Sequence, residues 1–580
     1  MKEIIHFIVL FSISTLVLAK NEVETTHGRV AGTQFKTFLE EKKYQAFMGI
    51  PFATPPVKDL RFKSPQSMKP WEGVLKATKI KPACIQYNYN VLKSQYGEYG
   101  VEDCLYLDIF TPAVDENKRP VVIFLYNERL QNSYNKTKDY SPDFFIEEDL
   151  VVVTISHRLT VFGFLSLEDD TVPGNAGLKD IVMALEWISN NIDKFGGDPS
   201  KITLLGAQGG AVAVDLLIRS KAKKFFHSAI IQSGSSLNPM YLQEKVRDRA
   251  FELGKLLEIS TSSTHRLLEE LNSVSPSKLF ELEYRAAPDD YFKDNQKGIL
   301  TFGPIVEKHA NGLITEYPED SFENINIPVM IGFNSREGLA ASHLYLETPN
   351  YLTYVEKDFP LLMPLRLKFR FDPFASSYYN AAKDIKNFYF KKGKVTIKST
   401  PEYVTYIGDV VAYSLDKTAK MYANLSSKPV YYYHFDYYGD FNENKDLLLK
   451  KAVVEDGTWG ATIGDELCYL FRCPNLNDKY AKLKSLEADK IGTQKKIVKM
   501  WANFVKYGNP TPENDSLLND IKWPSYNLET KEYLLIGKNF QVKTNLWQER
   551  FKFWDNFIKK WEKRAHNGVV TDDKSKRDEL

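Results

Sequence analysis

Five short apolar runs constrain the fold of this chain more than any other feature. They span residues 121–125, 150–155, 202–205, 229–231 and 328–331. Short runs without regular polar alternation are typical of strands that are buried on both faces of a parallel sheet. Between the second and third runs, apolar residues recur at helical spacing, at Leu178, Ile181, Leu185, Ile188 and Ile192. Strands that alternate with helices predict a central, mostly parallel, twisted sheet with helices on both faces.

Composition places the chain among large globular proteins. It has 580 residues, a formal net charge of +1 and 43% hydrophobic residues, with no low-complexity tract or internal repeat. A chain of this length can bury a large core. The balanced charge disfavours nucleic acid as a partner. After residue 19 no apolar segment is long enough to span a bilayer, so we expect no transmembrane anchor.

The third apolar run leads into a turn that holds Gly206, Gln208 and Gly210. A strand, a sharp turn and a helix, with glycines at the first and fifth turn positions, form the nucleophile elbow of the G-x-S-x-G motif. The glycines relieve crowding where the chain reverses, and residues 211–218 are expected to form the helix that follows. Gln208 stands at the serine position, and its amide cannot be converted into an alkoxide nucleophile.

Four further segments carry a longer pattern. They read GIPFA at 49–53, EDCLYLDIF at 102–110, GNAGLKD at 174–180 and FGGDP at 195–199. Together with the elbow they resemble the type B carboxylesterase and cholinesterase family, and the resemblance runs from about residue 28 to about residue 561. It implies an α/β-hydrolase fold in a single domain, which we place at residues 20–565.

The resemblance also assigns the catalytic positions of the family. The family's serine falls at Gln208, its histidine at Ile463 and its triad acid at Glu337, so that the acid alone is retained. The family's oxyanion hole comes from a His-Gly-Gly-Gly run after a central strand. In this chain that run is replaced by residues without a glycine, namely Tyr126, Asn127, Glu128 and Arg129.

These replacements predict that the family mechanism is lost. Removing a serine nucleophile or its histidine lowers turnover by roughly a millionfold, and the ~10³ to 10⁴ that remains over water depends on the oxyanion hole and on binding. We interpret four other candidate nucleophiles and bases as scaffold residues: Ser233, Ser235, His157 and His434. A nucleophilic cysteine needs a nearby cation or base, and the sequence shows none for Cys468. Because Glu337 lacks its usual partner, we expect it to be protonated, to bond a donor such as the Gln208 amide, or to reach water.

Both ends of the chain carry targeting patterns. Residues 1–19 combine a lysine, a mostly apolar stretch and a small-residue cleavage site, which is typical of a secretory signal peptide. Residues 566–580 form a charged tail that ends in RDEL, a variant of the KDEL retrieval signal. We therefore expect residence in the lumen of the endoplasmic reticulum and recognition by its retrieval receptor. Secretion is the alternative.

Cysteines and glycosylation sequons agree with passage through an oxidising lumen. The resemblance implies a disulfide between Cys84 and Cys104. Cys468 and Cys473 could pair with each other or stay free, and the sequence leaves both possibilities open. Sequons of the form Asn-x-Ser/Thr, which mark potential glycosylation sites, begin at Asn135, Asn424 and Asn514.

Two classes of function follow from these patterns. The favoured hypothesis is a non-catalytic family member that binds an unknown protein partner or a small hydrophobic or polar ligand, without a metal or cofactor. If Glu128 and Arg129 point into the old substrate gorge, they fill it or favour a polar or anionic ligand. The alternative is a carboxylic ester hydrolase with atypical or residual catalysis.

The last helical pattern lies at residues 547–561, where aromatic and apolar residues recur at helical spacing. A helix that docks on the domain is the favoured interpretation, and a helix at a membrane surface is the other.

Overall fold

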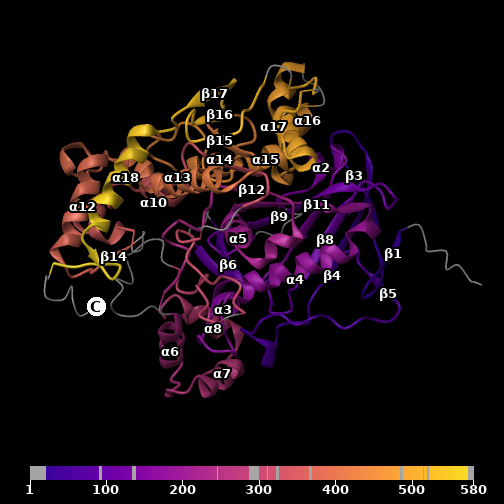
Figure 1. Cartoon of the computed structure of the whole chain (residues 1–580), viewed down its shortest axis with the longest axis horizontal. Coiled ribbons are helices and arrows are strands. Elements are labelled where there is room, and N and C mark those ends of the chain that lie inside the picture. Colours follow the sequence, from indigo (N-terminus) through magenta and orange to yellow (C-terminus); the bar gives the residue numbers. More distant parts are fainter. Residues whose placement is uncertain are drawn as a thin grey trace, which may run out of the picture.

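The computed structural model describes residues 21–90, 95–133, 139–244, 246–286, 300–309, 311–321, 325–364, 369–483, 488–513, 515–518 and 521–572. The expected signal peptide, the sequons at Asn135 and Asn514 and the C-terminal RDEL lie outside these residues. Figure 1 shows the described part of the chain arranged around one large sheet.

The central sheet has eleven strands in the order β17-β16-β15-β13-β12-β11-β9-β10-β8-β4-β3 (Figure 1). In chain order they are β3 (Thr33–Lys36), β4 (Lys43–Pro51), β8 (Tyr106–Thr111), β9 (Arg119–Asn127), β10 (Val151–Ile155), β11 (Gly197–Gln208), β12 (Ser228–Gln232), β13 (Val329–Asn334), β15 (Val430–Phe435), β16 (Glu532–Ile536) and β17 (Phe540–Thr544). The strands from β16 to β10 are parallel. The outer strands pair antiparallel with their neighbours. The five apolar runs form β9 to β13, so the predicted fold is confirmed.

Alternating side chains of β9 show why the sheet needs cover on both faces. Val121, Ile123 and Leu125 belong to one buried cluster. Val122, Phe124 and Tyr126 belong to a second cluster. Since successive strand residues point to opposite faces, the two clusters are the two sides of the sheet.

Helices contribute side chains to each cluster. The first cluster includes side chains of α4 (Ala176–Asn191), α5 (Gly209–Ile218) and α13 (Thr400–Leu425). The second includes side chains of α2 (Asp143–Glu147), α16 (Asn477–Leu483) and α17 (Ala488–Tyr507). Helices therefore lie on both faces, as the alternating pattern predicts.

Further helices extend beyond these two layers. Three lie together away from the sheet in Figure 1: α6 (Val246–Leu256), α7 (Thr264–Ser273) and α8 (Pro276–Glu283). Four others lie between β13 and β15 in the chain: α9 (Gly338–Ala341), α10 (His343–Glu347), α11 (Leu352–Lys357) and α12 (Ser376–Tyr389). Two follow β15: α14 (Glu443–Leu449) and α15 (Leu467–Leu470).

The C-terminal helix α18 (Gln548–Glu562) docks on the domain, as expected. Its buried side chains are Phe551, Trp554, Phe557, Ile558 and Trp561. Because these apolar groups face the protein core, the helix presents its polar face to solvent. Across the described helices, none combines the length and apolarity that crossing a membrane requires.

The folded chain continues a few residues past the boundary that we placed at residue 565. Strand β18 (Ala565–His566) pairs with β19 (Val569–Val570), which also pairs with β14 (Arg370–Phe371). Val570 is fully buried. The β-branched valines suit a strand, so only the residues beyond this hairpin belong to the charged tail.

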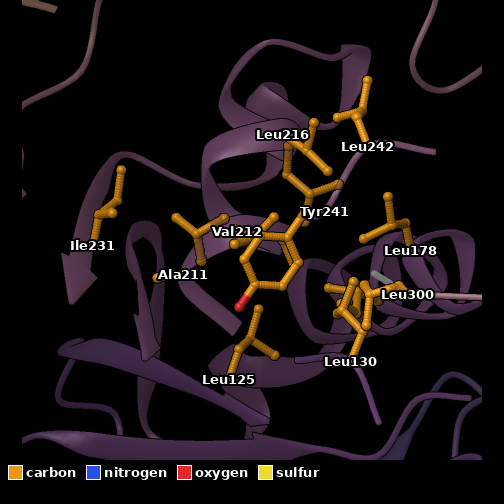
Figure 2. Close-up of a cluster of buried hydrophobic side chains, with 14 of the residues drawn as sticks. Leu125, Leu130, Leu178, Ala211, Val212, Leu216, Ile231, Tyr241, Leu242 and Leu300 are labelled. Atoms are coloured by element: carbon orange, nitrogen blue, oxygen red, sulfur yellow. The ribbon is translucent and has the colours of Figure 1, made fainter. Parts of the chain in front are cut away.

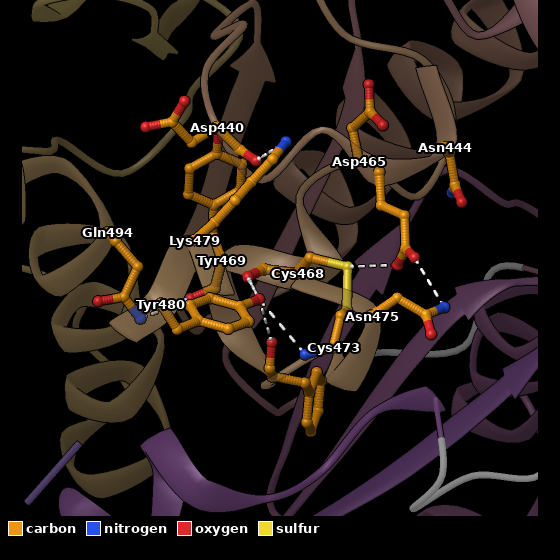
Figure 3. The surroundings of a disulfide bond; sticks show 12 residues. Asp440, Asn444, Asp465, Cys468, Tyr469, Cys473, Asn475, Lys479, Tyr480 and Gln494 are labelled. Carbon is orange, nitrogen blue, oxygen red and sulfur yellow. Dashed lines mark hydrogen bonds between the residues drawn. A yellow bond between two sulfur atoms is a disulfide. The ribbon is translucent and has the colours of Figure 1, made fainter. Parts of the chain in front are cut away.

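Both cysteine pairs form disulfides. The Cys84–Cys104 bond that the family resemblance implies is confirmed. Cys468 and Cys473, which the sequence left open, are also bonded to each other (Figure 3). All four cysteines of the chain are therefore oxidised.

Candidate functional site

The turn after β11 has the geometry of a nucleophile elbow. Gln208 has φ +54° and ψ −118°, a strained backbone conformation, and α5 begins at the next residue. A Cβ on Gly210 would lie 1.9 Å from the carbonyl oxygen of Leu125, and a Cβ on Gly206 would lie 2.5 Å from the oxygen of Gly210. Only glycine fits at either position, which explains why both glycines accompany this turn.

The Gln208 side chain is buried and directed at an aromatic residue of β9. Its Nε2 donates a hydrogen bond to the Tyr126 hydroxyl at 3.2 Å. A Cβ on Gly464 would lie 3.3 Å from the same Nε2, so the segment that contains Ile463 lies against the elbow. The structure thus brings together Gln208 and Ile463, two positions 255 residues apart in the sequence.

Glu337 is buried and accepts hydrogen bonds from other residues. Its Oε1 accepts hydrogen bonds from the Ser233 hydroxyl at 2.6 Å, from the Asn334 backbone N–H at 2.6 Å and from the Asn334 side chain at 3.4 Å. The Gln208 amide, which we expected as a possible donor, bonds Tyr126 instead. Burial raises the pKa of Glu337 to about 7, against the opposing effect of these hydrogen bonds. Near neutral pH the carboxyl group is therefore partly protonated.

Two further buried carboxyl groups accompany Glu337. Asn334 Nδ2 donates to Glu466 Oε2 at 2.7 Å, and Gln232 Nε2 donates to Glu466 Oε1 at 3.1 Å. Burial, followed by the charge of Glu337, raises the pKa of Glu466 to about 7. Asp465 also has a pKa raised to about 7, mainly by burial. The sequence analysis named neither acid as a site residue, although they lie two and three residues after Ile463.

Ile463, at the position where the resemblance places the family's histidine, carries no proton-transfer group. Ile463 is half-buried, and its carbonyl oxygen accepts a hydrogen bond from Asn444 Nδ2 at 3.0 Å. His157 is held by scaffold contacts, with Nε2 3.3 Å from Asn127 Nδ2 and Nδ1 3.1 Å from the Arg158 carbonyl oxygen. Burial lowers the pKa of His434 to about 3, so its ring stays neutral.

The segment at the oxyanion-hole position places an acceptor beside the elbow. Asn127 is fully buried, and its Oδ1 accepts the backbone N–H of Leu130 at 2.9 Å. A Cβ on Gly209 would lie 2.0 Å from this Oδ1, so the amide oxygen lies against the first residue of α5. An oxyanion hole requires N–H donors at the place where negative charge develops. The oxygen of Asn127 has the opposite polarity.

Glu128 contacts the same tyrosine hydroxyl as Gln208, and the filling of a gorge by Glu128 and Arg129 stays a prediction. The carboxylate of Glu128 accepts hydrogen bonds from the Tyr126 hydroxyl at 3.0 Å and from Asn132 Nδ2 at 3.2 Å. Arg129 is exposed and has a φ of +53°. The next residue, Leu130, also has a positive φ and is fully buried, so the chain returns to the core directly after the arginine.

Tyr241 occupies the space beside the elbow helix, a role that the sequence did not reveal. Figure 2 shows its ring packed against Val212 of α5, with its hydroxyl directed toward Leu125. Its exposed fraction is 4%. Burial raises its pKa well above the usual value. The aromatic ring therefore excludes water from the apolar space behind the elbow.

Glu443, Cys468 and Cys473 form the one group of potential metal ligands in the described part of the chain. Cys468 Sγ lies 3.5 Å from Glu443 Oε2 (Figure 3). Both sulfurs belong to the disulfide, and a disulfide sulfur is not the thiolate that binds metal ions. This group therefore carries no metal site in the oxidised protein.

Comparisons with known proteins agree with this geometry. The model of the carboxylesterase family matches residues 19–554. Juvenile hormone esterase of Tribolium castaneum is 30% identical over 531 residues, which cover 88% of this chain and 86% of that protein. Esterase FE4 of Myzus persicae is 30% identical over 86% of each chain. Liver carboxylesterase 1F of Rattus norvegicus is 28% identical over 98% of this chain and all of that protein. With its parallel sheet and its elbow, this chain belongs to the carboxylesterase family and has the α/β-hydrolase fold.

Proposed function

We propose that this carboxylesterase-family protein does not hydrolyse esters and acts instead by binding a protein partner or a small ligand. The observation that carries the proposal is the Asn127 amide oxygen beside Gly209, together with the Gln208 amide at the serine position. The Asn127 oxygen removes the environment that stabilises an oxyanion, and the Gln208 amide takes the place of the nucleophile.

The chemistry of acyl transfer supports this proposal step by step. Attack on an ester carbonyl needs an oxygen nucleophile and a base that takes its proton. Gln208 has no acidic O–H to activate, and the hydrocarbon side chain of Ile463 cannot accept a proton. Several similar proteins are named as esterases, for example juvenile hormone esterase and esterase FE4. The fold of such enzymes is kept here without the groups that perform the reaction.

One contact favours a second function, a hydrolase with rearranged chemistry. Ser233 Oγ lies 2.6 Å from Glu337, whose pKa of about 7 is suited to a general base. However, the same hydroxyl also accepts from Asn334 Nδ2 at 3.2 Å, and Ser233 is 3% exposed. A nucleophile has to reach a substrate, so these contacts agree better with a structural turn.

Labelling with a fluorophosphonate probe separates the two functions, because the probe modifies an activated serine. We expect no labelling of the glycosylated, oxidised full-length protein under conditions that label an active esterase of the family completely. Labelling of the wild type that disappears in the Ser233→Ala variant would support the rearranged hydrolase and overturn the proposal.

We place this function in the lumen of the endoplasmic reticulum. The two disulfides support an oxidising compartment. Asn424, the sequon within the described residues, is exposed near the C-terminal end of α13 and accessible to a glycosyltransferase. The RDEL terminus supports retrieval. In transfected cells, deletion of Leu580 is expected to move the protein into the medium, whereas equal secretion of both forms would argue for the secretory alternative.

A further inference from the structure

A pocket lies between two helices and the chain that follows β12, away from the vacated catalytic positions. Residues of α13, of α18 and of the segment around Leu237 line it, and the space inside it that a water-sized molecule can reach is about 40 Å³. Figure 1 shows α13 and α18 close together at one side of the molecule. Gln208, Glu337 and Ile463 are not among its lining residues.

The walls of this pocket are apolar and held in place. Tyr413 and Trp554 stack with ring centroids 6.0 Å apart at an interplanar angle of 29°. The Tyr413 hydroxyl donates to Asp555 at 2.8 Å, and Trp554 Nε1 donates to the Tyr389 hydroxyl at 2.8 Å. Since their polar atoms are bonded to these residues, both rings can turn apolar surface toward the pocket. Leu237, Val410 and Ile558 complete the apolar wall.

The polar lining carries one charge of each sign. Lys417 and Glu319 both line the pocket, and Lys417 Nζ lies 6.0 Å from the centroid of the Tyr413 ring. An anionic head group is attracted by the lysine and repelled by the glutamate, and a cationic head group meets the reverse. A neutral group that both donates and accepts hydrogen bonds can use both side chains without either repulsion.

We propose that this pocket binds a small, uncharged and mostly apolar molecule that carries a single hydrogen-bonding end, such as an alcohol. Its hydrocarbon part packs against the walls formed by Leu237, Tyr413 and Trp554, and its polar end lies near Lys417 and Glu319. Apolar walls with a few polar groups are typical of small-molecule sites. The assignment rests on the proposed binding function, which it extends by locating the ligand outside the old catalytic site.

The test uses the neutral fluorescent probe N-phenyl-1-naphthylamine with the full-length protein. We expect fluorescence to increase on binding, and we expect 1-decanol to displace the probe at a concentration at least about tenfold lower than decanoate or decylamine require. Equal displacement by the three compounds, or better displacement by either charged one, would overturn the assignment of a neutral ligand.

Paired variants locate the site. Leu237→Trp fills the pocket and is expected to weaken probe binding by about tenfold or more. Leu344→Trp makes the same change at a residue of α10 that is 40% exposed, and binding should stay within about twofold of the wild type. Equal affinity in both variants would place the probe elsewhere and overturn the assignment.

Two measurements keep the proposal testable if Leu237→Trp fails to fold. Val410→Phe fills the same pocket from α13, where Val410 is half-buried. A diazirine analogue of decanol, photoactivated on the wild-type protein, should label peptides that contain Leu237 or Ile558; labelling confined to other peptides contradicts the site. Fluorophosphonate labelling tests the catalytic question independently, so failure here is distinguishable from failure of the proposed function.

Discussion

Three buried carboxyl groups dominate the chemistry of individual residues. Glu337, Asp465 and Glu466 influence one another electrostatically, and the pKa of each is raised to about 7, mainly by burial. An acid with a raised pKa binds more protons in the folded than in the unfolded state. Its folded form is therefore favoured below the unfolded pKa, and that stability is lost as the pH rises toward 7.

Replacing Glu337 by Gln mimics the protonated carboxyl group and should reveal this dependence. The free energy of unfolding of Glu337→Gln minus that of the wild type should be larger at pH 8 than at pH 5, by about 2 kcal/mol. The reason is that only the wild type has to ionise a buried carboxyl group as the pH rises. Urea denaturation at the two pH values measures the difference. Glu186→Gln, at an exposed site on α4, is the control. A stability difference that does not change with pH would contradict the assignment.

At the scale of single elements, the elbow depends on backbone packing. The strand β11, the turn and α5 meet so closely that a Cβ on Gly210 would overlap the carbonyl oxygen of Leu125. The turn is therefore maintained by contacts between main-chain atoms, which do not depend on the residue at position 208. This explains how the elbow keeps its conformation with glutamine in place of serine.

Two glycine substitutions should give opposite results. We expect Gly210→Ala to destabilise the protein by about 3 kcal/mol or to prevent folding. The new Cβ would overlap the Leu125 carbonyl oxygen, and neither the main chain of β9 nor that of α5 can move away. A Cβ on Gly492, within α17, meets no atom within 4 Å. Gly492→Ala should stabilise the protein by up to about 1 kcal/mol, since alanine favours a helix. Thermal unfolding of both variants tests the pair, and similar shifts in the two would disagree with the packing argument.

The two disulfides close loops of different length, which predicts an order of stability. In the chain-entropy model, a bond across 20 residues contributes about 3 kcal/mol and one across 5 residues about 2 kcal/mol. The double variant in which Cys84 and Cys104 are replaced by alanine should therefore be less stable than the double variant in which Cys468 and Cys473 are replaced. Urea denaturation of the two double variants measures this, and the reverse order would contradict it.

For the whole molecule, the sequence predicted the architecture better than the site. Buried strands such as β9 and β12 are readable because a parallel strand requires an apolar run wherever it lies. The grouping of Asn334, Glu337 and Glu466 was not readable, because the end of β13 and the residue before α15 bring these side chains together only in three dimensions. Tyr241 and the pocket beside Trp554 were missed for the same reason, since packing between distant segments leaves no periodic signal in the chain.

The proposed loss of esterase activity predicts which residues would have to change to give catalysis. The variant with Gln208→Ser and Ile463→His regains the family's triad residues around Glu337, yet Asn127 still presents an oxygen beside the elbow. We expect its fluorophosphonate labelling to be slow, and the further change Asn127→Gly to accelerate it by about tenfold or more, because an acceptor is removed where the oxyanion forms. The control adds Asn444→Gly instead, at a residue that bonds the Ile463 carbonyl. If both third changes accelerate labelling equally, relief of crowding rather than polarity limits the site. If the variant with two changes already reacts as fast as a family esterase, the Asn127 oxygen is no obstacle to catalysis.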